Sequence, residues 1–91
     1  MSFEDYKSLV AQSESVGAAL MCARLANNLS LEDLAERTKV STRFLRALEA
    51  DDFGVFASRI YIMGFAKAYA KVVGLDIEGV ASSLRRQLSP Q

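Results

Sequence analysis

Few side chains in this 91-residue sequence are suited to catalysis. Asp51 and Asp52 are adjacent carboxylates of the kind used in general acid–base chemistry, and Cys22 is the single thiol. The chain has no histidine, so the commonest general base and metal ligand is missing. We interpret the acid pair as part of a solvated loop and Cys22 as a small, buried or half-buried helix residue. We therefore expect no enzymatic activity, no cofactor and no metal site.

A second group of residues has the spacing of a DNA-reading surface. In a helix-turn-helix protein the first turns of the second helix of the motif enter the major groove, where guanidinium groups are good donors to guanine. The residues that would contact DNA in this way are Lys39, Thr42, Arg43 and Arg46. The sequence thus keeps open a DNA-binding regulator as an alternative function.

Two short helical patterns position these residues, and each begins with a serine cap. Ser30 precedes a run in which Leu31, Leu34, Ala35 and Thr38 share one face, and Ser41 precedes Phe44, Leu45 and Leu48 at similar spacing. Residues 39–41 alone connect the two patterns, so the helices must turn sharply, with Val40 as an apolar plug inside the turn. This spacing predicts a helix-turn-helix.

The rest of the chain predicts three further helices and a polar N-terminal segment. Ser15 is expected to cap a helix that ends at Asn27-Asn28, in which Val16, Leu20 and Ala23 face inward and Arg24 lies outside this stripe. Ser58 and Asp76 are expected to cap two more, over residues 59–73 and 77–88. Phe53 and Phe56 are expected to attach the intervening loop to the core. Residues 1–14 are expected to be an arm or a short helix, and residues 89–91 a tail. The prediction is an all-α, five-helix bundle over residues 15–88.

The helix expected over residues 59–73 has a wider apolar surface than a small domain needs. Two adjoining stripes cover about 160° of its circumference, whereas about 100° suffices for a surface helix. The first stripe consists of Ile62, Ala66, Tyr69 and Val73, and the second of Tyr61, Phe65, Ala68 and Val72. One stripe is in excess. It carries an aromatic pair, Tyr61 and Phe65, with Gly64 between them.

This excess stripe is a candidate protein-binding site. Tyr61 and Phe65 would form its apolar centre, with Lys67 and Lys71 on the polar side of the helix. The alternative is that the last helix or residues 1–14 simply cover the aromatic pair.

Charge opposes strong DNA binding. The net charge of the chain is zero, and residues 39–52 carry three basic and three acidic side chains: Lys39, Arg43, Arg46, Glu49, Asp51 and Asp52. Phosphate contacts supply most of the non-specific affinity for duplex DNA, so a neutral reading surface should bind weakly as a monomer, although Glu49 could be turned inward. A single cysteine cannot form an internal disulfide, which favours a reducing cytoplasm.

The motif order resembles a known family. Residues 17–49 are similar to the phage-repressor-like (XRE) helix-turn-helix, and the pattern Tyr61, Gly64-Phe65, Tyr69-Ala70, Gly74-Leu75-Asp76 looks like the N-terminal cytoplasmic domain of RodZ-like cell-shape proteins. The resemblance implies a five-helix domain that binds the actin homologue MreB through aromatic residues of the fourth helix. Carried over by position, these contacts fall on Tyr61 and Phe65.

The sequence also departs from this family. Met63 occupies a position that is usually basic, Val55-Phe56 replaces a Leu-Pro pair, and Leu31 replaces a glutamine that repressors often use near phosphate. The last change weakens the DNA interpretation. RodZ-like proteins continue into a linker, one transmembrane helix and a periplasmic part, so the resemblance implies either the cytoplasmic module of such a protein or a short relative, with no membrane contact of its own.

Overall fold

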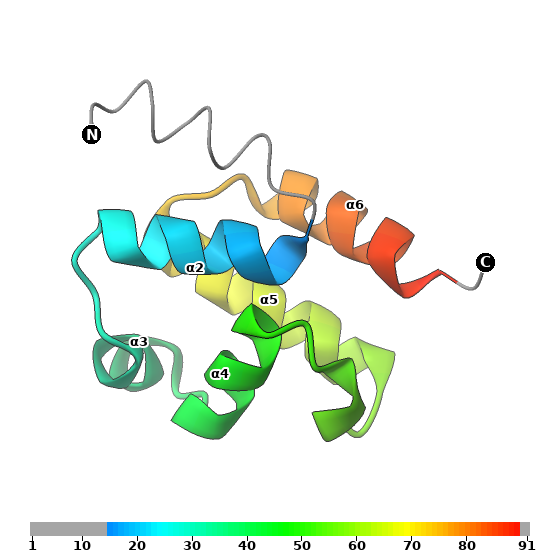
Figure 1. Ribbon diagram of the computed structural model, residues 1–91, viewed down its shortest axis with the longest axis horizontal. Coiled ribbons are helices and arrows are strands. Elements are labelled where there is room, and N and C mark those ends of the chain that lie inside the picture. Colours follow the sequence, from blue (N-terminus) through cyan, green and yellow to red (C-terminus); the bar gives the residue numbers. More distant parts are fainter. Residues whose placement is uncertain (1–14, 90–91) are drawn as a thin grey trace.

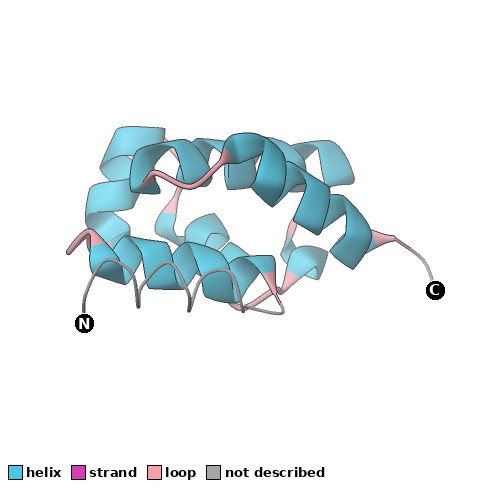
Figure 2. Cartoon of the chain, turned by 90° about the horizontal axis from the view of Figure 1, so that it is seen from above, coloured by secondary structure: helices cyan, strands magenta, loops and turns pink. Residues whose placement is uncertain are grey.

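The structure, a computed structural model, describes residues 15–89 and contains the predicted helices. They are α2 (Val16–Ala26), α3 (Leu31–Thr38), α4 (Thr42–Glu49), α5 (Arg59–Val73) and α6 (Ile77–Leu88), with a short 3-10 turn, η1 (Phe53–Val55), before α5. Figure 2 shows only helices and loops in this range. The prediction of an all-α fold with five helices is confirmed. The segment expected to be an arm or short helix, residues 1–14, lies outside the described residues.

α5 is the central helix. It packs against α2, α3, α4 and α6. In Figure 1, α2 and α6 lie along one side of the domain and α3 and α4 along the other, with α5 passing between them. The largest fully buried side chains come from every helix: Leu20, Leu34, Leu45, Leu48, Tyr69 and Leu84. The core is therefore a single cluster built around α5.

Local hydrogen bonds explain why most helices begin where the sequence predicts. Ser15 accepts from the amide of Ala18, and Asp76 accepts from the amide of Gly79, each at 3.0 Å. Ser30 accepts from the amide of Asp33 while the Asp33 carboxylate accepts from the amide of Ser30, a reciprocal capping box. The Ser30 backbone amide also lowers the pKa of Asp33 below its ordinary value.

The helix-turn-helix has the predicted connection. α3 ends at Thr38 and α4 begins at Thr42, and Val40 is buried in the turn. Lys39 takes a left-handed conformation, with φ of 62°. The Thr38 hydroxyl donates to the carbonyl of Leu34 at 2.8 Å and accepts from the amide of Val40 at 3.2 Å, so it stabilises the turn from inside.

The prediction that Arg24 lies outside the apolar stripe is wrong. Its side chain is buried, with 9% of the residue surface exposed. Arg24 donates from Nε and Nη2 to the two carboxylate oxygens of Glu49, at 2.7 and 3.1 Å, and from Nη1 to the carbonyl of Leu29 at 3.0 Å. Burial is tolerated because the carboxylate compensates the charge and these bonds satisfy the guanidinium. The hydrogen bond with Glu49 raises the pKa of Arg24.

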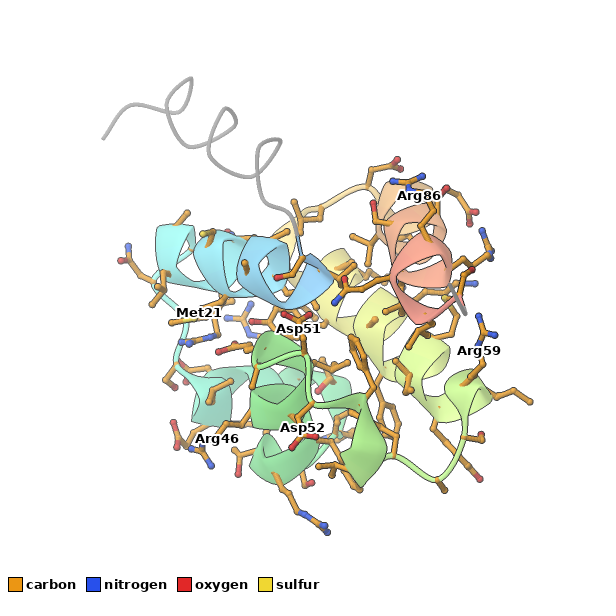
Figure 3. All side chains as sticks on the ribbon, turned by 45° about the vertical axis from the view of Figure 1, so that its right-hand side comes forward. Met21, Arg46, Asp51, Asp52, Arg59 and Arg86 are labelled. Atoms are coloured by element: carbon orange, nitrogen blue, oxygen red, sulfur yellow. The ribbon has the colours of Figure 1, made fainter. Side chains whose placement is uncertain are left out.

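The interpretation of Asp51 as part of a solvated loop is also wrong. Asp51 is half-buried, and its Oδ1 accepts from the amide of Gly17 at 3.0 Å and from Nε2 of Gln87 at 2.8 Å. Figure 3 shows Asp51 beside the first turn of α2, with Asp52 further along the loop. α2 has no acidic residue in its own first turn, and Asp51 supplies a carboxylate there from the end of α4. Asp52 is exposed.

The loop before α5 is attached to the core by its phenylalanines. Phe56 is buried, and Phe53 is half-buried and packs against the core cluster, as the sequence predicts. The positive backbone angle near this loop occurs at Asp51, with φ of 56°. Tertiary hydrogen bonds to Asp51 hold it in this conformation, which asparagine and aspartate tolerate better than most residues.

Candidate functional site

The two apolar stripes of α5 have different environments. The first stripe faces the core, and all four of its members are buried: Ile62, Ala66, Tyr69 and Val73. The second stripe is at the surface, where Phe65, Ala68 and Val72 are half-buried and Tyr61 is 54% exposed. α6 packs against α5 but leaves Tyr61 accessible. The core therefore absorbs one stripe and leaves the other partly open.

Phe65 differs from Tyr61 because it belongs to an aromatic cluster. Its ring centroid lies 5.6 Å from that of Phe44 on α4 and 5.9 Å from that of Phe56 in the loop. The Tyr61 ring lies 6.1 Å from the Phe65 ring, at the outer edge of this cluster. These separations are within the range of favourable aromatic contacts. The cluster thus holds the Phe65 ring, against which the Tyr61 ring packs.

Sequence reasoning missed Ile60. It is 82% exposed, at the first turn of α5 beside Tyr61. At 100° per residue, Ile60 falls on the polar face, between Lys67 and Lys71. The sequence does contain a signal for Ile60, namely a large apolar residue on the polar face of the helical wheel. Gly64 lies between Ile60 and Tyr61 on this surface, and a Cβ there would meet no atom within 4 Å.

The lysines and the aromatic residues occupy adjoining parts of the helix surface. Lys67 is half-buried and Lys71 is exposed. We define the α5 surface as Ile60, Tyr61, Gly64, Phe65, Lys67 and Lys71. It combines three large apolar side chains, a glycine and two lysines, which is the composition of a small protein-binding patch.

The residues considered for DNA contact also lie together, at the turn and on α4. Lys39, Arg43 and Arg46 are exposed, and Thr42 is half-buried. Figure 3 shows Arg46 pointing away from the fold. The Arg43 guanidinium lies 5.5 Å from the centre of the Phe44 ring, a cation–π contact that orients it along the helix surface.

The buried ion pair changes the charge that this surface presents. Glu49 is turned inward to Arg24, so one acidic side chain is removed from the end of α4. The same pair removes Arg24 from any phosphate contact. Tyr69 completes the group, because its hydroxyl donates to Glu49. Burial is the main cause that raises the pKa of Tyr69, and the neighbouring Glu49 raises it further.

Cys22 is half-buried on α2, in agreement with the prediction of a small packing residue. Within residues 15–89 no group of three or more acidic or cysteine side chains is arranged to hold a metal ion. No helix of the same segment is both long and apolar enough to cross a lipid bilayer.

Comparisons with known proteins agree with the fold. A family model described as a helix-turn-helix domain matches residues 19–80. The cytoskeleton protein RodZ of Streptococcus pneumoniae is 38% identical over 65 residues, which cover 71% of this chain and 24% of RodZ. The uncharacterized membrane protein YmfM of Bacillus subtilis is 40% identical over 50 residues, 55% of this chain and 17% of YmfM.

The chain therefore spans about a quarter or less of the length of these two relatives. No solved structure matches it significantly. The family match covers most of the chain and includes the helix-turn-helix together with α5. The chain belongs to the helix-turn-helix domain family and is a RodZ-like member of it.

Proposed function

We propose that this domain is a non-enzymatic adaptor of a bacterial cell-shape protein, and that it binds the actin homologue MreB in the cytoplasm through the α5 surface. The relative with 38% identity is named a cytoskeleton protein, and the resemblance to RodZ-like domains implies MreB as the partner. Tyr61 is the central contact, Phe65 supports it from below, and Lys67 and Lys71 lie at the rim.

The observation that carries this proposal is the accessibility of two large apolar side chains on the first turn of α5. Ile60 is 82% and Tyr61 54% exposed, and they occupy consecutive positions of α5. Single exposed apolar residues are common, but two of them within one helical turn, close to an open glycine and to lysines, are typical of interaction sites. Gly64 leaves room for the backbone or a side chain of a partner to approach α5 closely.

The aromatic cluster supports the proposal through rigidity. Phe44 and Phe56 hold the Phe65 ring, so little conformational entropy of this side chain remains to be lost on binding. Tyr61 brings a large contact area with only two rotatable side-chain angles. Lys67 and Lys71 would favour a partner with acidic residues at the rim of its groove, and this contribution would weaken as salt increases.

The test is binding to purified MreB, measured by biolayer interferometry or anisotropy. Tyr61→Ala and Ile60→Ala are expected to weaken binding, with Tyr61→Ala costing about 2 kcal/mol, or about 30-fold in Kd. Leu25→Ala is the matched control, because Leu25 is 53% exposed but lies on α2. The affinity of this variant for MreB should be unchanged.

Phe65 needs a gentler substitution because it also packs against the core cluster. Phe65→Leu keeps most of the apolar volume while removing the ring that supports Tyr61, so we expect a smaller loss of affinity with retained folding. Unchanged affinity in both Tyr61→Ala and Ile60→Ala would rule the α5 surface out as the MreB site.

DNA binding is the second candidate function, and the exposure of Arg43 and Arg46 on α4 favours it. The inward turn of Glu49 also makes this surface less acidic than the sequence alone indicates. The DNA-binding hypothesis predicts that the chain binds duplex DNA with a steep salt dependence. Arg43→Ala and Arg46→Ala should weaken this binding, whereas Arg85→Ala, on α6, should leave the affinity unchanged. Only weak, sequence-independent association at low salt would exclude a sequence-specific regulator.

A further inference from the structure

A row of aromatic side chains joins the α5 surface to α4. The Tyr61 ring lies 6.1 Å from the Phe65 ring, and the Phe65 ring lies 5.6 Å from that of Phe44, measured between centroids. Tyr61 is exposed and the two phenylalanines are half-buried, so each residue keeps some solvent-accessible surface. We define this aromatic row as Tyr61, Phe65 and Phe44. The open apolar surface therefore does not end at the edge of α5 but crosses to the helix-turn-helix.

Arg43 continues the aromatic row at its α4 end. The Arg43 guanidinium lies 5.5 Å from the centre of the Phe44 ring. At 100° per residue Arg43 would lie about 100° from Phe44 around α4, so the cation–π contact turns this exposed charge toward the row. Arg46 is also exposed, but it lies about 160° from Phe44, and Figure 3 shows it pointing away from the fold. Contact with the aromatic row thus distinguishes Arg43 from Arg46.

The lysines of the α5 surface are less well placed to act together with the aromatic row. Lys67 falls about 120° from Tyr61 around the helix. Lys71 lies ten residues beyond Tyr61, which is about 15 Å along the helix axis. The charge that is joined to the aromatic row by side-chain contact is that of Arg43.

We propose that the partner-binding surface spans α4 and α5, and that Arg43 pairs with a carboxylate of the partner at the edge of the groove that receives Tyr61. This extension rests on the proposed function of the α5 surface, and it adds the acidic group that the partner must carry. A guanidinium stacked on a ring has a fixed plane and can bind a carboxylate through two parallel hydrogen bonds. Arginine beside aromatic residues is also typical of the side chains that dominate binding energy at protein interfaces.

Neighbouring charge favours a carboxylate over a phosphate as the group that Arg43 binds. α3 packs against α4 and exposes Glu32, Asp33 and Glu36. In helix-turn-helix docking the first helix of the motif crosses the DNA backbone, so a duplex would bring several phosphates close to these acids. A protein partner needs to place only one carboxylate at Arg43, and its apolar side chains can cover the aromatic row.

The test compares charge-removing variants of the whole chain in binding to purified MreB. Arg43→Gln should weaken the affinity by about tenfold, because hydrogen bonds between charged groups are lost. Arg46→Gln, on the same helix, is the matched control and should change the affinity by less than about twofold, as should Lys71→Gln. All three side chains are exposed, so we expect the variants to fold, and thermal melts check this.

A double-variant cycle tests whether the Phe44 ring orients Arg43. Phe44→Leu keeps most of the apolar volume but removes the face of the ring. In this background Arg43→Gln should weaken binding by only about threefold, because the arginine is no longer held toward the partner. An equal loss in the two backgrounds would overturn the positioning of Arg43 by Phe44.

Tyr61→Ala and Arg43→Gln together separate the two proposals. If Tyr61→Ala weakens binding to MreB and Arg43→Gln does not, the α5 surface stands and its extension to α4 is overturned. Equal losses in Arg43→Gln and Arg46→Gln would also overturn the extension, since general charge attraction would explain them. A loss of affinity for duplex DNA alone in Arg43→Gln would assign Arg43 to a DNA-reading surface instead. Unchanged MreB binding in both Tyr61→Ala and Ile60→Ala would reject the proposed function and the extension with it.

Discussion

Arg24 of α2 and Glu49, the last residue of α4, form a buried bidentate ion pair although 25 residues separate them in the sequence. The exposed fractions of the two side chains are 10% and 9%. Tyr69 of α5 donates to the same carboxylate, so three helices meet at one charged group. This arrangement joins the helix-turn-helix to the central helix that carries the α5 surface.

Removing one partner of the pair should destabilise the fold strongly. Glu49→Leu leaves the Arg24 guanidinium buried without a counter-charge, and we expect the free energy of unfolding to fall by about 3–5 kcal/mol. The double variant with Arg24→Met and Glu49→Leu should lose clearly less than the sum of the single variants. Urea denaturation of all four proteins measures this coupling, and strict additivity would show that the pair contributes nothing as a unit.

The Tyr69 hydroxyl should make the domain sensitive to alkali. The pKa of Tyr69 is raised in the folded state, whereas the same phenol in the unfolded chain ionises near pH 10. Above that pH the unfolded state therefore binds fewer protons at this residue than the folded state does. The contribution of Tyr69 is therefore complete below about pH 10 and is lost progressively at higher pH.

Tyr69→Phe tests this dependence. At neutral pH the variant should lose about 1.5–3 kcal/mol, because a hydrogen bond to a charged group is removed. The difference between the two proteins should shrink from about pH 10 upward, since the phenylalanine variant has no proton to lose at this site. Urea unfolding at pH 7, 9, 10 and 11 measures the difference, and a constant gap would contradict the assignment.

Replacement of two helical glycines by alanine should change the stability of the fold in opposite directions. A Cβ at Gly17 would lie 2.5 Å from the carbonyl oxygens of Leu48 and Glu49, so Gly17→Ala forces α2 away from the end of α4 and should cost about 2 kcal/mol or more. Gly64 has open space around it and sits inside α5, so Gly64→Ala should stabilise by about 0.5–1 kcal/mol. Thermal melts of both variants test the pair, and a stabilising Gly17→Ala would refute the close approach of α2 and α4.

The serines before α3 and α4 look equivalent in sequence but differ in contacts. Ser30 accepts a hydrogen bond from the amide of Asp33, whereas the Ser41 side chain forms no cap hydrogen bond. Ser30→Ala should therefore lower the free energy of unfolding by about 1 kcal/mol, and Ser41→Ala by only about 0.3 kcal/mol. Equal losses in chemical denaturation would indicate that Ser41 caps α4 in solution.

The helices of this protein and their ends could be predicted from the sequence. Periodic apolar residues, capping side chains and Gly74, which has φ of 81° after α5, act within one or two turns of chain, so their effects are visible locally. The same holds for the helix-turn-helix, because a three-residue connection with one apolar residue leaves few ways to arrange two helices. The excess apolar stripe of α5 was also visible as a simple count around one helix.

The environment of individual side chains could not be predicted in this way. Arg24 is inward because Glu49 and Tyr69 meet it from two other helices, and Asp51 is a cap because its loop returns to the first turn of α2. Phe65 is held in place within the α5 surface by its ring contacts with Phe44 and Phe56.

Local sequence thus determined which segments are helical and where they end, since propensity and capping are short-range effects. The tertiary structure decided which charges are buried and which apolar residues remain accessible, Tyr61 above all. The physical reason is that the cost of burying a charge, or of exposing an apolar ring, depends on partners brought by distant parts of the chain.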